Sequence, residues 1–447
     1  MKLRWIQVTV LLALTLQACN PLQSAARAIR DERPNFLLII TDDQRYDSMQ
    51  YMPETQARIF DQGVTFKYGY ITTPLCCPSR SSILTGEYAH NTGVRENGDK
   101  LTKRTFPEDF HENGYSTALV GKYLNSWKGE PRPEFDFWVS YFKGEVRYDD
   151  PPLNVNGKWS KHSGYVSDIL GDYAVQYIQQ AAPQNKPFLL IFAPNAPHEP
   201  STPYAGDLNL FPDMQPYRPP SYNEADTSDK PDWFQNRAPL TEAEMAELDQ
   251  ARRDQILTLV SLDRAIGRIL QALQDSGEMD KTVIIFLSDN GKFWGEHRIT
   301  SKNSFYEEAT HVPFAMRYPP LVPTPYVDEK NIVANIDIAP TFYQLAEIPI
   351  PASVDGWPLT KLLNGGPWRQ DLLIEGWPPR GEYAALRTGC YVYAETNGDR
   401  AELYNLDLDP YQLTNIADDP ANQTLVADLK KRLDAIRGPL PTPPPAP

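Results

Sequence analysis

Cysteine and histidine are scarce in this chain of 447 residues. It has four cysteines and six histidines, and neither residue type forms a cluster with the spacing of a zinc site. So few cysteines exclude a disulfide framework, which a domain of this size does not need for its stability. The sequence therefore indicates a large core held together by packing, and it disfavours zinc as a bound metal.

No apolar stretch is long enough to cross a bilayer as a helix. Residues 1–18 begin with basic residues, continue with the apolar run Val8–Leu16, and are typical of a secretory signal. The segment ends in Leu16-Gln17-Ala18-Cys19, which resembles a bacterial lipoprotein cleavage site. We expect export to the bacterial periplasm or cell surface, with a lipid at Cys19 as the only membrane attachment. Export without a lipid is the alternative.

Positive charge is outnumbered in this sequence. The 43 lysines and arginines face 58 aspartates and glutamates, which gives a formal net charge of −15. This balance argues against nucleic acid or an anionic membrane surface as a partner. An anionic substrate must therefore be attracted by cations placed locally at its site.

Proline, by contrast, is abundant, and its 42 residues are roughly twice the average share. This favours long ordered loops around an α/β core. Four apolar runs are typical of strands covered on both faces, and they span Asn35–Ile40, Ser116–Val120, Pro187–Phe192 and Thr282–Leu287. The clearest helical pattern spans Gln250–Gln274. The alternation predicts a large, mainly parallel sheet sandwiched by helices.

The chain divides by composition into five parts. We predict a signal at 1–18, a tether at 19–33, one large domain at 34–367, a smaller subdomain at 368–438 and a disordered proline-rich tail at 439–447. The subdomain should hold a small antiparallel sheet plus a helix, from strands at Tyr383–Arg387, Cys390–Glu395 and Ala401–Asn405 and a helix at Gln423–Arg437. Within the large domain, we predict that Pro200–Leu240 is an insertion that lies near the site and forms a wall that contributes to substrate specificity.

Polar side chains follow the apolar runs of the large domain. They are Asp42, Asp43, Lys122, His198, Asp289 and Asn290. Ligands of open α/β sheets gather outside the carboxyl ends of the strands. The carboxylate and amide oxygens suit Ca²⁺, or Mg²⁺ and Mn²⁺ with stricter geometry. Taken alone, each acidic pair is equally consistent with a helix cap or a turn.

The most informative stretch of the sequence is Leu75-Cys76-Cys77-Pro78-Ser79-Arg80-Ser81-Ser82-Ile83-Leu84-Thr85-Gly86. Pro78 suits the first turn of a helix, so Cys76 should lie just ahead of a helix N-terminus. Backbone N–H groups and the helix dipole favour negative charge there. A thiol in this position can be a nucleophile, a metal ligand or the substrate of a modification, and composition does not choose among these.

This run resembles the signature of the type I sulfatases, within the alkaline phosphatase superfamily, at each of its fixed positions. The doubled cysteine, together with Gly121-Lys122-Tyr123-Leu124-Asn125, is similar to the N-acetylglucosamine-6-sulfatase branch, which includes the heparan endosulfatases. The resemblance implies an alkaline phosphatase-like fold and a Cys76 that is oxidised to Cα-formylglycine by a formylglycine-generating or anaerobic maturation enzyme. Cys77 does not fit that role, because Ser79 then falls where the signature requires proline.

The resemblance also implies a role for each polar residue named above. The divalent ion, generally Ca²⁺, is held by Asp42, Asp43, Cys76 in its modified form, Asp289 and Asn290. Arg80, Lys122 and Lys302 bind the sulfate oxygens, and His198 protonates the bridging oxygen. The expected activity is that of a sulfuric ester hydrolase acting on a sulfated carbohydrate.

Several residues keep more than one interpretation. Many sulfatases carry a histidine at the place of Leu124, so the base that regenerates the aldehyde stays open. His297 either lines the pocket or is structural. We expect His90 and the run Tyr306-Glu307-Glu308 to be structural. If Cys76 is modified and Cys19 lipidated, Cys77 and Cys390 form the one possible internal disulfide.

Two other functions compete with the sulfatase hypothesis. One is a phosphodiesterase or phosphonate monoester hydrolase of the same superfamily, which uses the same modified nucleophile. The other is a non-catalytic surface lipoprotein that binds sulfated glycan. The presence of nearly all the expected reacting residues argues against the second of these.

Overall fold

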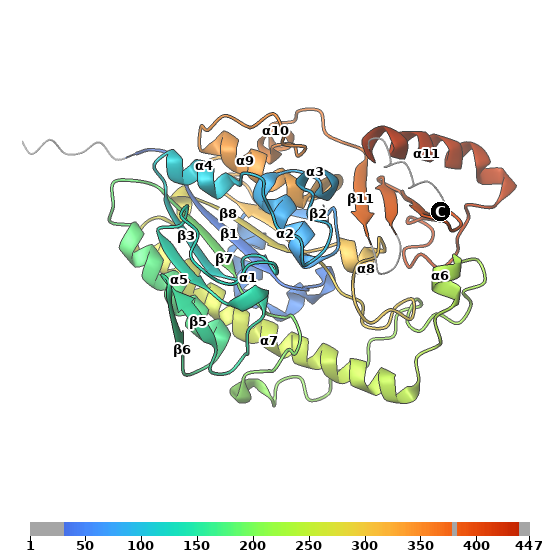
Figure 1. Cartoon of the computed structure of the whole chain (residues 1–447), viewed down its shortest axis with the longest axis horizontal. Helices are drawn as coiled ribbons and strands as arrows, with labels where there is room; N and C mark the ends of the chain where they lie inside the picture. The colour runs from blue at the N-terminus through green and yellow to red at the C-terminus, as the bar shows by residue number, and fades with distance from the viewer. Residues whose placement is uncertain (1–30, 378–381, 438–447) are drawn as a thin grey trace, which may run out of the picture.

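The computed structural model describes residues 31–377 and 382–437 of the chain. The predicted signal, Cys19 and the predicted tail at 439–447 lie outside the described residues. A ten-stranded sheet with helices on both faces forms the large part of the molecule, and a four-stranded sheet forms the smaller part (Figure 1). The predicted fold class is confirmed. The predicted boundary between the two parts, at residue 367, stays a prediction.

Parallel pairing dominates the large sheet. From one edge to the other its strands are β10 (Tyr326–Ala334), β2 (Val64–Tyr70), β9 (Phe314–Arg317), β8 (Thr282–Ser288), β1 (Asn35–Thr41), β7 (Phe188–Ala193), β3 (Ser116–Gly121), β4 (Phe137–Ser140), β5 (Pro152–Val155) and β6 (Lys158–Lys161). The antiparallel pairs are β2 with β9, β8 with β9, β4 with β5 and β5 with β6. The strands predicted from apolar runs are β8, β1, β7 and β3, which lie side by side at the centre of the sheet. They are buried along their whole length, as expected for strands covered on both faces.

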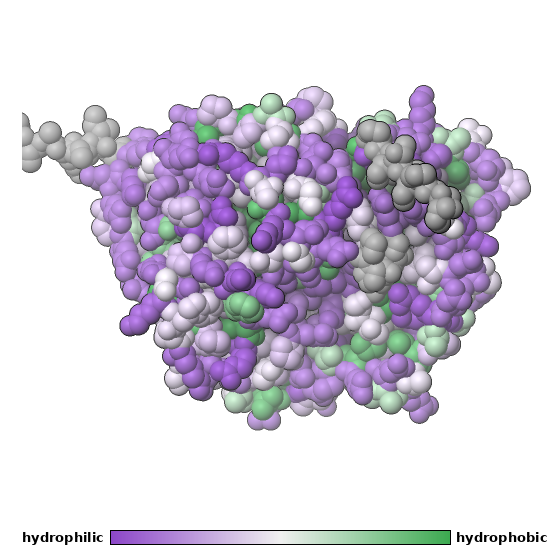
Figure 2. All heavy atoms as spheres, viewed as in Figure 1, coloured by the Kyte–Doolittle hydropathy of each residue, from purple (hydrophilic) through white to green (hydrophobic). Residues whose placement is uncertain are grey.

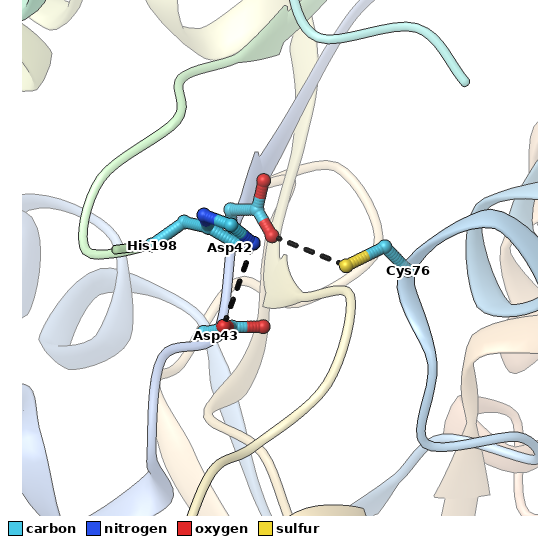
Figure 3. Close-up of side chains that lie close together, drawn as sticks. All are labelled: Asp42, Asp43, Cys76 and His198. Carbon is cyan, nitrogen blue, oxygen red and sulfur yellow. Dashed lines mark hydrogen bonds and ion pairs between the residues drawn. The ribbon is translucent and has the colours of Figure 1, made fainter. Parts of the chain in front are cut away.

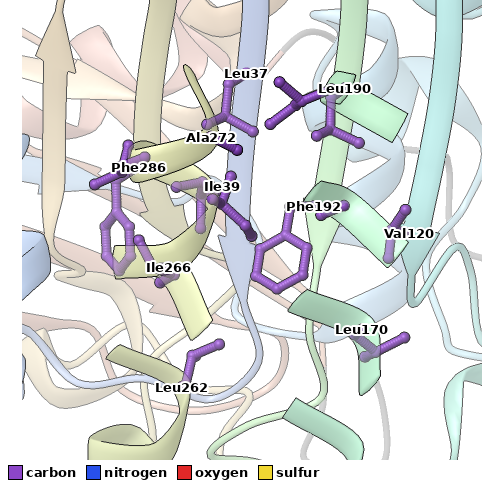
Figure 4. Close-up of a cluster of buried hydrophobic side chains, with 14 of the residues drawn as sticks. Leu37, Ile39, Val120, Leu170, Leu190, Phe192, Leu262, Ile266, Ala272 and Phe286 are labelled. Atoms are coloured by element: carbon purple, nitrogen blue, oxygen red, sulfur yellow. The ribbon is translucent and has the colours of Figure 1, made fainter. Parts of the chain in front are cut away.

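Helices cover both faces of this sheet. The described helices are α1 (Pro53–Arg58), α2 (Cys76–Thr85), α3 (Ala89–Thr92), α4 (Phe106–Glu112), α5 (Val166–Ala181), α6 (Asp232–Gln235), α7 (Glu242–Asp275), α8 (Glu307–Thr310), α9 (Ile338–Leu345), α10 (Leu359–Leu363) and α11 (Gln423–Arg437). On one face α5 and α7 pack together against the strands, where Leu170, Leu262 and Ile266 meet Ile39, Phe192 and Phe286 (Figure 4). On the other face α2, α4 and α9 cover the second apolar layer.

Helix α7 is longer than its apolar pattern predicts. It begins at Glu242 rather than near Gln250, and Thr241 caps it by accepting a hydrogen bond from the N–H of Glu244. The additional turns are mostly exposed and run on past the sheet (Figure 1). Because these turns bury no apolar face, hydrophobic periodicity could not reveal them.

The C-terminal part is an antiparallel sheet of β11 (Leu372–Gly376), β12 (Tyr383–Arg387), β13 (Tyr391–Thr396) and β14 (Glu402–Asn405). Helix α11, which spans the predicted residues, packs on one face through Leu429 and Leu433. The other face packs against the large domain through an apolar cluster that includes Phe305 and Tyr306. The two sheets thus share buried surface.

The outer surface is mainly polar. The face in Figure 2 is largely hydrophilic, and its hydrophobic areas are small and separate. Among the described helices, we find none with the length and apolarity that crossing a bilayer requires.

The strand register places the predicted site residues together at the carboxyl ends of the central strands. Strands β1 and β8 pair in parallel, with Thr41 opposite Ser288. Asp42 and Asp289, the next residue of each strand, therefore leave the sheet at the same level. Lys122 follows β3, which is separated from β1 by β7 and whose last residue Gly121 lies opposite Ala193 of β7.

Gly121 makes the turn that carries Lys122 into this region. Its φ is +120°, a backbone angle that residues other than glycine rarely adopt. A Cβ at this position would overlap the carbonyl oxygen of Ala193, the same oxygen that accepts the N–H of Lys122 at 2.6 Å. The site thus requires glycine at the end of β3.

We expect Gly121→Ala to lower the free energy of unfolding by about 2 kcal/mol or more, because strain and overlap act together. Urea denaturation of the purified protein measures this. Gly98→Ala is the matched control, since no atom lies within contact distance of its added methyl, and we expect a change below about 0.5 kcal/mol. Equal stabilities of the two variants would contradict the assignment of Gly121.

Candidate active site

Helix α2 presents Cys76 at its first turn. The sequence placed this residue just ahead of the helix, whereas the structure begins the helix at Cys76, after an extended Leu75. The whole helix is buried, and it ends at Gly86, whose φ of +75° and bond to the carbonyl of Ser82 are typical of a glycine C-cap. The side chain of Cys76 is fully buried.

Four side chains from three segments of the chain, those of Asp42, Asp43, Cys76 and His198, meet around one point (Figure 3). The Sγ of Cys76 lies 3.6 Å from Oδ1 of Asp42, and Nε2 of His198 lies 3.9 Å from Oδ2 of Asp43. One potential ligand atom from each of these residues lies within 4.8 Å of the others. The arrangement is compact enough for the four groups to face a single ion.

The residues that follow β8 complete this group. Asp289 accepts the backbone N–H of Asp43 at 3.2 Å, and the amide of Asn290 donates to Oδ1 of Asp43 at 2.6 Å. These bonds hold Asp43 at a φ of +67°, an uncommon conformation for a residue with a side chain. The Oδ1 of Asn290 is buried and has no hydrogen-bond partner in the described part of the chain. That free oxygen is a suitable additional ligand for a hard cation.

Two lysines neutralise the acids. Nζ of Lys122 donates to Oδ2 of Asp42 at 2.6 Å. Nζ of Lys302 lies 2.9 Å from the Sγ of Cys76 and also contacts Oδ1 of Asp43. Lys122 is fully buried and the Lys302 side chain only 15% exposed, so these positive charges act in a region with little water.

Arg80 supplies the third positive charge. Its Nε donates to Oδ2 of Asp289 at 2.7 Å, and its Nη1 donates to the carbonyl of Lys122 at 3.2 Å. Its Nη2 is buried without a hydrogen-bond partner among the residues described. Its nearest acid, Oδ2 of Asp42, lies 3.7 Å away, so Nη2 keeps the capacity to donate a hydrogen bond to an oxyanion.

The surrounding charges separate the pKa values of the site. Burial opposes ionisation of Asp42, but the positive charges around it, that of Lys122 first, hold its pKa well below the usual value. The pKa of Asp289 is raised by burial and by the nearby charge of Asp42. Burial raises the pKa of the Cys76 thiol to about 12. An unmodified thiol here is therefore protonated at neutral pH and a poor nucleophile.

His198 lies at the rim of the group, in the loop after β7. Its ring is 28% exposed, and Nδ1 lies 2.7 Å from the carbonyl oxygen of Glu199. Because a carbonyl can only accept, Nδ1 carries the hydrogen and Nε2 faces the acids.

A cavity of about 950 Å³ opens beside His198. Its walls come from three separate stretches of chain, and they are lined by Gly144, Glu145, Val146, Arg147, Pro152, Asn195, His198, Glu199, Pro200, Ser201, Glu247, Gln250, Ala251 and Asp254. Of the predicted insertion Pro200–Leu240, only its first residues, Pro200 and Ser201, are among these lining residues. Further along, the insertion packs against the loop after β8, where Asn223 donates to the carbonyl of Gly295.

Two further residues lie at the site or its cavity and were not predicted from the sequence. Lys292 donates to Oε1 of Glu199 at 2.6 Å, and its charge helps to lower the pKa of Asp43. Its place two residues after Asn290 was the available signal. Asn195 lines the cavity with a buried side chain, and no feature of its sequence context distinguishes it.

The structure also decides the role of His297. The residue is fully buried, lies 2.7 Å from Glu224 and stacks on Tyr306. It is therefore structural and does not line the cavity. Similarly, His90 pairs with Glu375.

The remaining residues with open interpretations are also buried or paired. Tyr306 donates to Glu402, and Glu307 begins α8. Leu124, where the resemblance expects a histidine, is buried in the apolar core. Cys77 and Cys390 are both free thiols, the first buried and the second exposed, so the structure contains no disulfide between them.

Comparison with known proteins gives matches along nearly the whole described chain. The family described as Sulfatase matches residues 34–348, and that described as N-sulphoglucosamine sulphohydrolase, C-terminal, matches residues 295–438. The N-acetylglucosamine-6-sulfatase of Homo sapiens is 30% identical, over 91% of this chain and 85% of that protein.

Two further similarities differ in coverage. The extracellular sulfatase SULF-1 homolog of Drosophila melanogaster is 32% identical over 79% of this chain, which spans only 33% of that protein's length. A protein solved in complex with its substrate, D-glucosamine-2-N,6-O-disulfate, is 25% identical with a TM-score of 0.81, over 90% of this chain and 97% of that one.

We expect Arg80→Met to lower the free energy of unfolding by about 3–5 kcal/mol, because it leaves the buried Asp289 without its charge partner. Chemical denaturation followed by circular dichroism measures this. Arg104→Met is the control: that arginine pairs with Asp109 and Glu112 at the surface, where loss of a pair costs below about 1 kcal/mol. A similar small effect at Arg80 would mean that the cluster does not depend on this charge.

Proposed function

The chain belongs to the sulfatase family and is a sulfuric ester hydrolase, and we propose that it removes sulfate from a carbohydrate through an oxidised Cys76. The observation that carries this proposal is the convergence of Cys76 with oxygen ligands and three fixed cations. In this proposal the thiol of the structure stands where an aldehyde and its hydrate would react.

Maturation has to precede completion of the fold. Cys76 is fully buried, so a formylglycine-generating or anaerobic maturation enzyme needs the segment while it is still accessible. That enzyme supplies the oxidation that replaces the thiol sulfur by an aldehyde oxygen. The ammonium of Lys302, 2.9 Å from the sulfur, is placed to donate a hydrogen bond to the new oxygen.

A divalent cation fits the oxygen-rich side of the site. The oxygens come from Asp42, Asp43, Asp289 and Asn290, all of them buried. The free Oδ1 of Asn290 and the mixture of carboxylate and amide ligands suit Ca²⁺, with Mg²⁺ or Mn²⁺ as alternatives. When bound, such an ion polarises a sulfate oxygen and offsets negative charge that develops on it.

The cations of the site explain how an acidic protein binds sulfate. Lys122, Lys302 and Arg80 are held in place by their contacts with the acids. We assign them to the sulfate oxygens, where fixed donors stabilise the charge of the transition state without reorganisation. The Nη2 of Arg80, which makes no hydrogen bond to the described residues, supports this assignment.

His198 is assigned to the leaving oxygen. One hydroxyl of the hydrated Cys76 aldehyde attacks sulfur, the bond from sulfur to the bridging oxygen breaks, and His198 supplies a proton to that oxygen. The second hydroxyl then loses its proton, sulfate is eliminated from position 76 and the aldehyde is restored. The position of its ring between the acids and the cavity supports this role, because the alcohol portion of the ester must leave toward open space.

The substrate class follows from the relatives. Several are N-acetylglucosamine-6-sulfatases, and one solved relative contains a sulfated glucosamine. We therefore propose 6-sulfated glucosamine derivatives as substrates. Export, with a lipid at Cys19, completes the proposal.

We expect the Cys76 peptide of the mature, active enzyme to be lighter than its sequence requires, by the change from a CH₂SH group to an aldehyde. Mass spectrometry of the digested protein measures this. Cys76→Ala should abolish sulfate release, whereas Cys77→Ala, which leaves the reacting position intact, should retain it. An active enzyme with an intact thiol at position 76 would refute the proposed nucleophile.

We expect His198→Ala to reduce kcat/KM for N-acetylglucosamine 6-sulfate by about 10²–10⁴-fold, the usual value of general acid catalysis. The loss should be much smaller for 4-nitrophenyl sulfate, because nitrophenolate leaves without needing a proton. His162→Ala, at a half-buried position beside Tyr173 and outside the site, is the control and should leave both rates unchanged. Equal losses on the two esters would show that His198 does not protonate the leaving group.

A further inference from the structure

We propose that the cavity beside His198 holds the sugar of the substrate, and that its acidic wall selects a neutral or positively charged sugar. A sugar with a second sulfate or a carboxylate near the ester would be disfavoured. The inference rests on the proposed function, because it concerns the part of the ester that His198 releases.

The cavity has the size and position that this role requires. Its volume of about 950 Å³ lies within the range of about 300–1,000 Å³ that is common for ligand sites. Gly144, at one wall, lies against the Lys122 side chain, and His198 lines the other side. The cavity therefore adjoins both a proposed sulfate ligand and the proposed acid.

Negative charge dominates the wall. Its charged side chains are Glu145, Arg147, Glu199, Glu247 and Asp254. Glu199 is neutralised by Lys292 at 2.6 Å. That leaves three carboxylates against one guanidinium, and the guanidinium of Arg147 donates to the carbonyl of Asp150.

Within the part of the chain that the structure describes, neither Glu247 nor Asp254 forms an ion pair, although the charge of the adjacent Arg253 attracts that of Asp254. Arg252 and Arg253, which precede Asp254, donate to backbone carbonyls of the insertion. Asp254 accepts only the uncharged amide of Gln250, at 2.8 Å. The carboxylates therefore present their charge to the cavity.

Asn195 is the independent sign that the cavity receives a ligand. Its side chain is 4% exposed and lines the cavity, yet its Oδ1 has no hydrogen-bond partner in the described residues. Buried polar atoms of folded proteins are nearly always satisfied. A hydroxyl or amide N–H of a bound sugar would satisfy this oxygen, so we assign Asn195 as a positioning residue.

The charge of the wall makes a specific prediction about substrate choice. The solved relative takes a glucosamine that carries two sulfates. In this chain a second anion would approach Glu247 and Asp254, and like charges at a binding site are strongly unfavourable. An acetylated or free amine avoids that repulsion.

Three 6-sulfated glucosamines that differ only at nitrogen test the inference: the free amine, the N-acetyl and the N-sulfo compound. The measured quantity is kcat/KM for release of the 6-sulfate at constant ionic strength. We expect the N-sulfo compound to be at least about tenfold poorer than the N-acetyl compound. The double variant Glu247→Gln/Asp254→Asn should reduce this difference to about threefold or less.

Two further variants complete the experiment. Glu242→Gln, an exposed acid of the same helix outside the cavity wall, is the matched control and should leave the difference unchanged. Asn195→Ala should raise KM for the N-acetyl compound by about three- to thirtyfold with little change in kcat. An unchanged KM in a folded Asn195→Ala protein would remove Asn195 from the site.

The other outcomes also decide the question. The inference is overturned if the wild-type enzyme prefers the N-sulfo compound, if the double variant keeps the full difference, or if none of the three compounds is hydrolysed while another sulfate ester is. If the protein with an oxidised Cys76 hydrolyses no sulfate ester at all, the proposed function fails, and this inference fails with it.

Discussion

The in-register parallel pairing of β1 with β8 is the constraint on which the site depends. Because Thr41 lies opposite Ser288, the acidic residues that follow both strands leave the sheet together. A shift of one residue would turn every side chain of the shifted strand to the opposite face of the sheet. The buried apolar runs of these strands on both faces of the sheet stabilise the register, so the core and the chemistry are coupled.

Concentrated charge follows from this geometry. Three buried carboxylates meet three buried or nearly buried cations, although the protein as a whole is acidic. Each cation compensates a carboxylate in the folded protein and is oriented by it toward Cys76. Electrostatic preorganisation of this kind needs a dry, rigid setting, which α2 provides by being buried along its whole length.

The two halves of α7 serve different purposes. Its C-terminal half packs on the sheet through residues such as Leu262 and Ile266, and its N-terminal half contributes Glu247 to the cavity wall. The proposed reaction centre and the cavity that we propose to select the substrate thus lie in different parts of the chain. This separation lets the cavity change while the centre stays the same.

The sequence by itself determined the central strands, the fold class and the residues that we propose to react, because apolar runs and the Cys76 motif are local patterns. The tertiary structure decided features that no local pattern encodes. They are the burial of His297, the contact of Lys292 with Glu199, the cavity, and the Oδ1 of Asn195 that has no hydrogen-bond partner among the described residues. These features arise where segments far apart in the chain pack together, such as Glu224 with His297, 73 residues apart, and Glu199 with Lys292, 93 residues apart. Such contacts depend on register and packing in three dimensions, and a linear pattern carries no information about them.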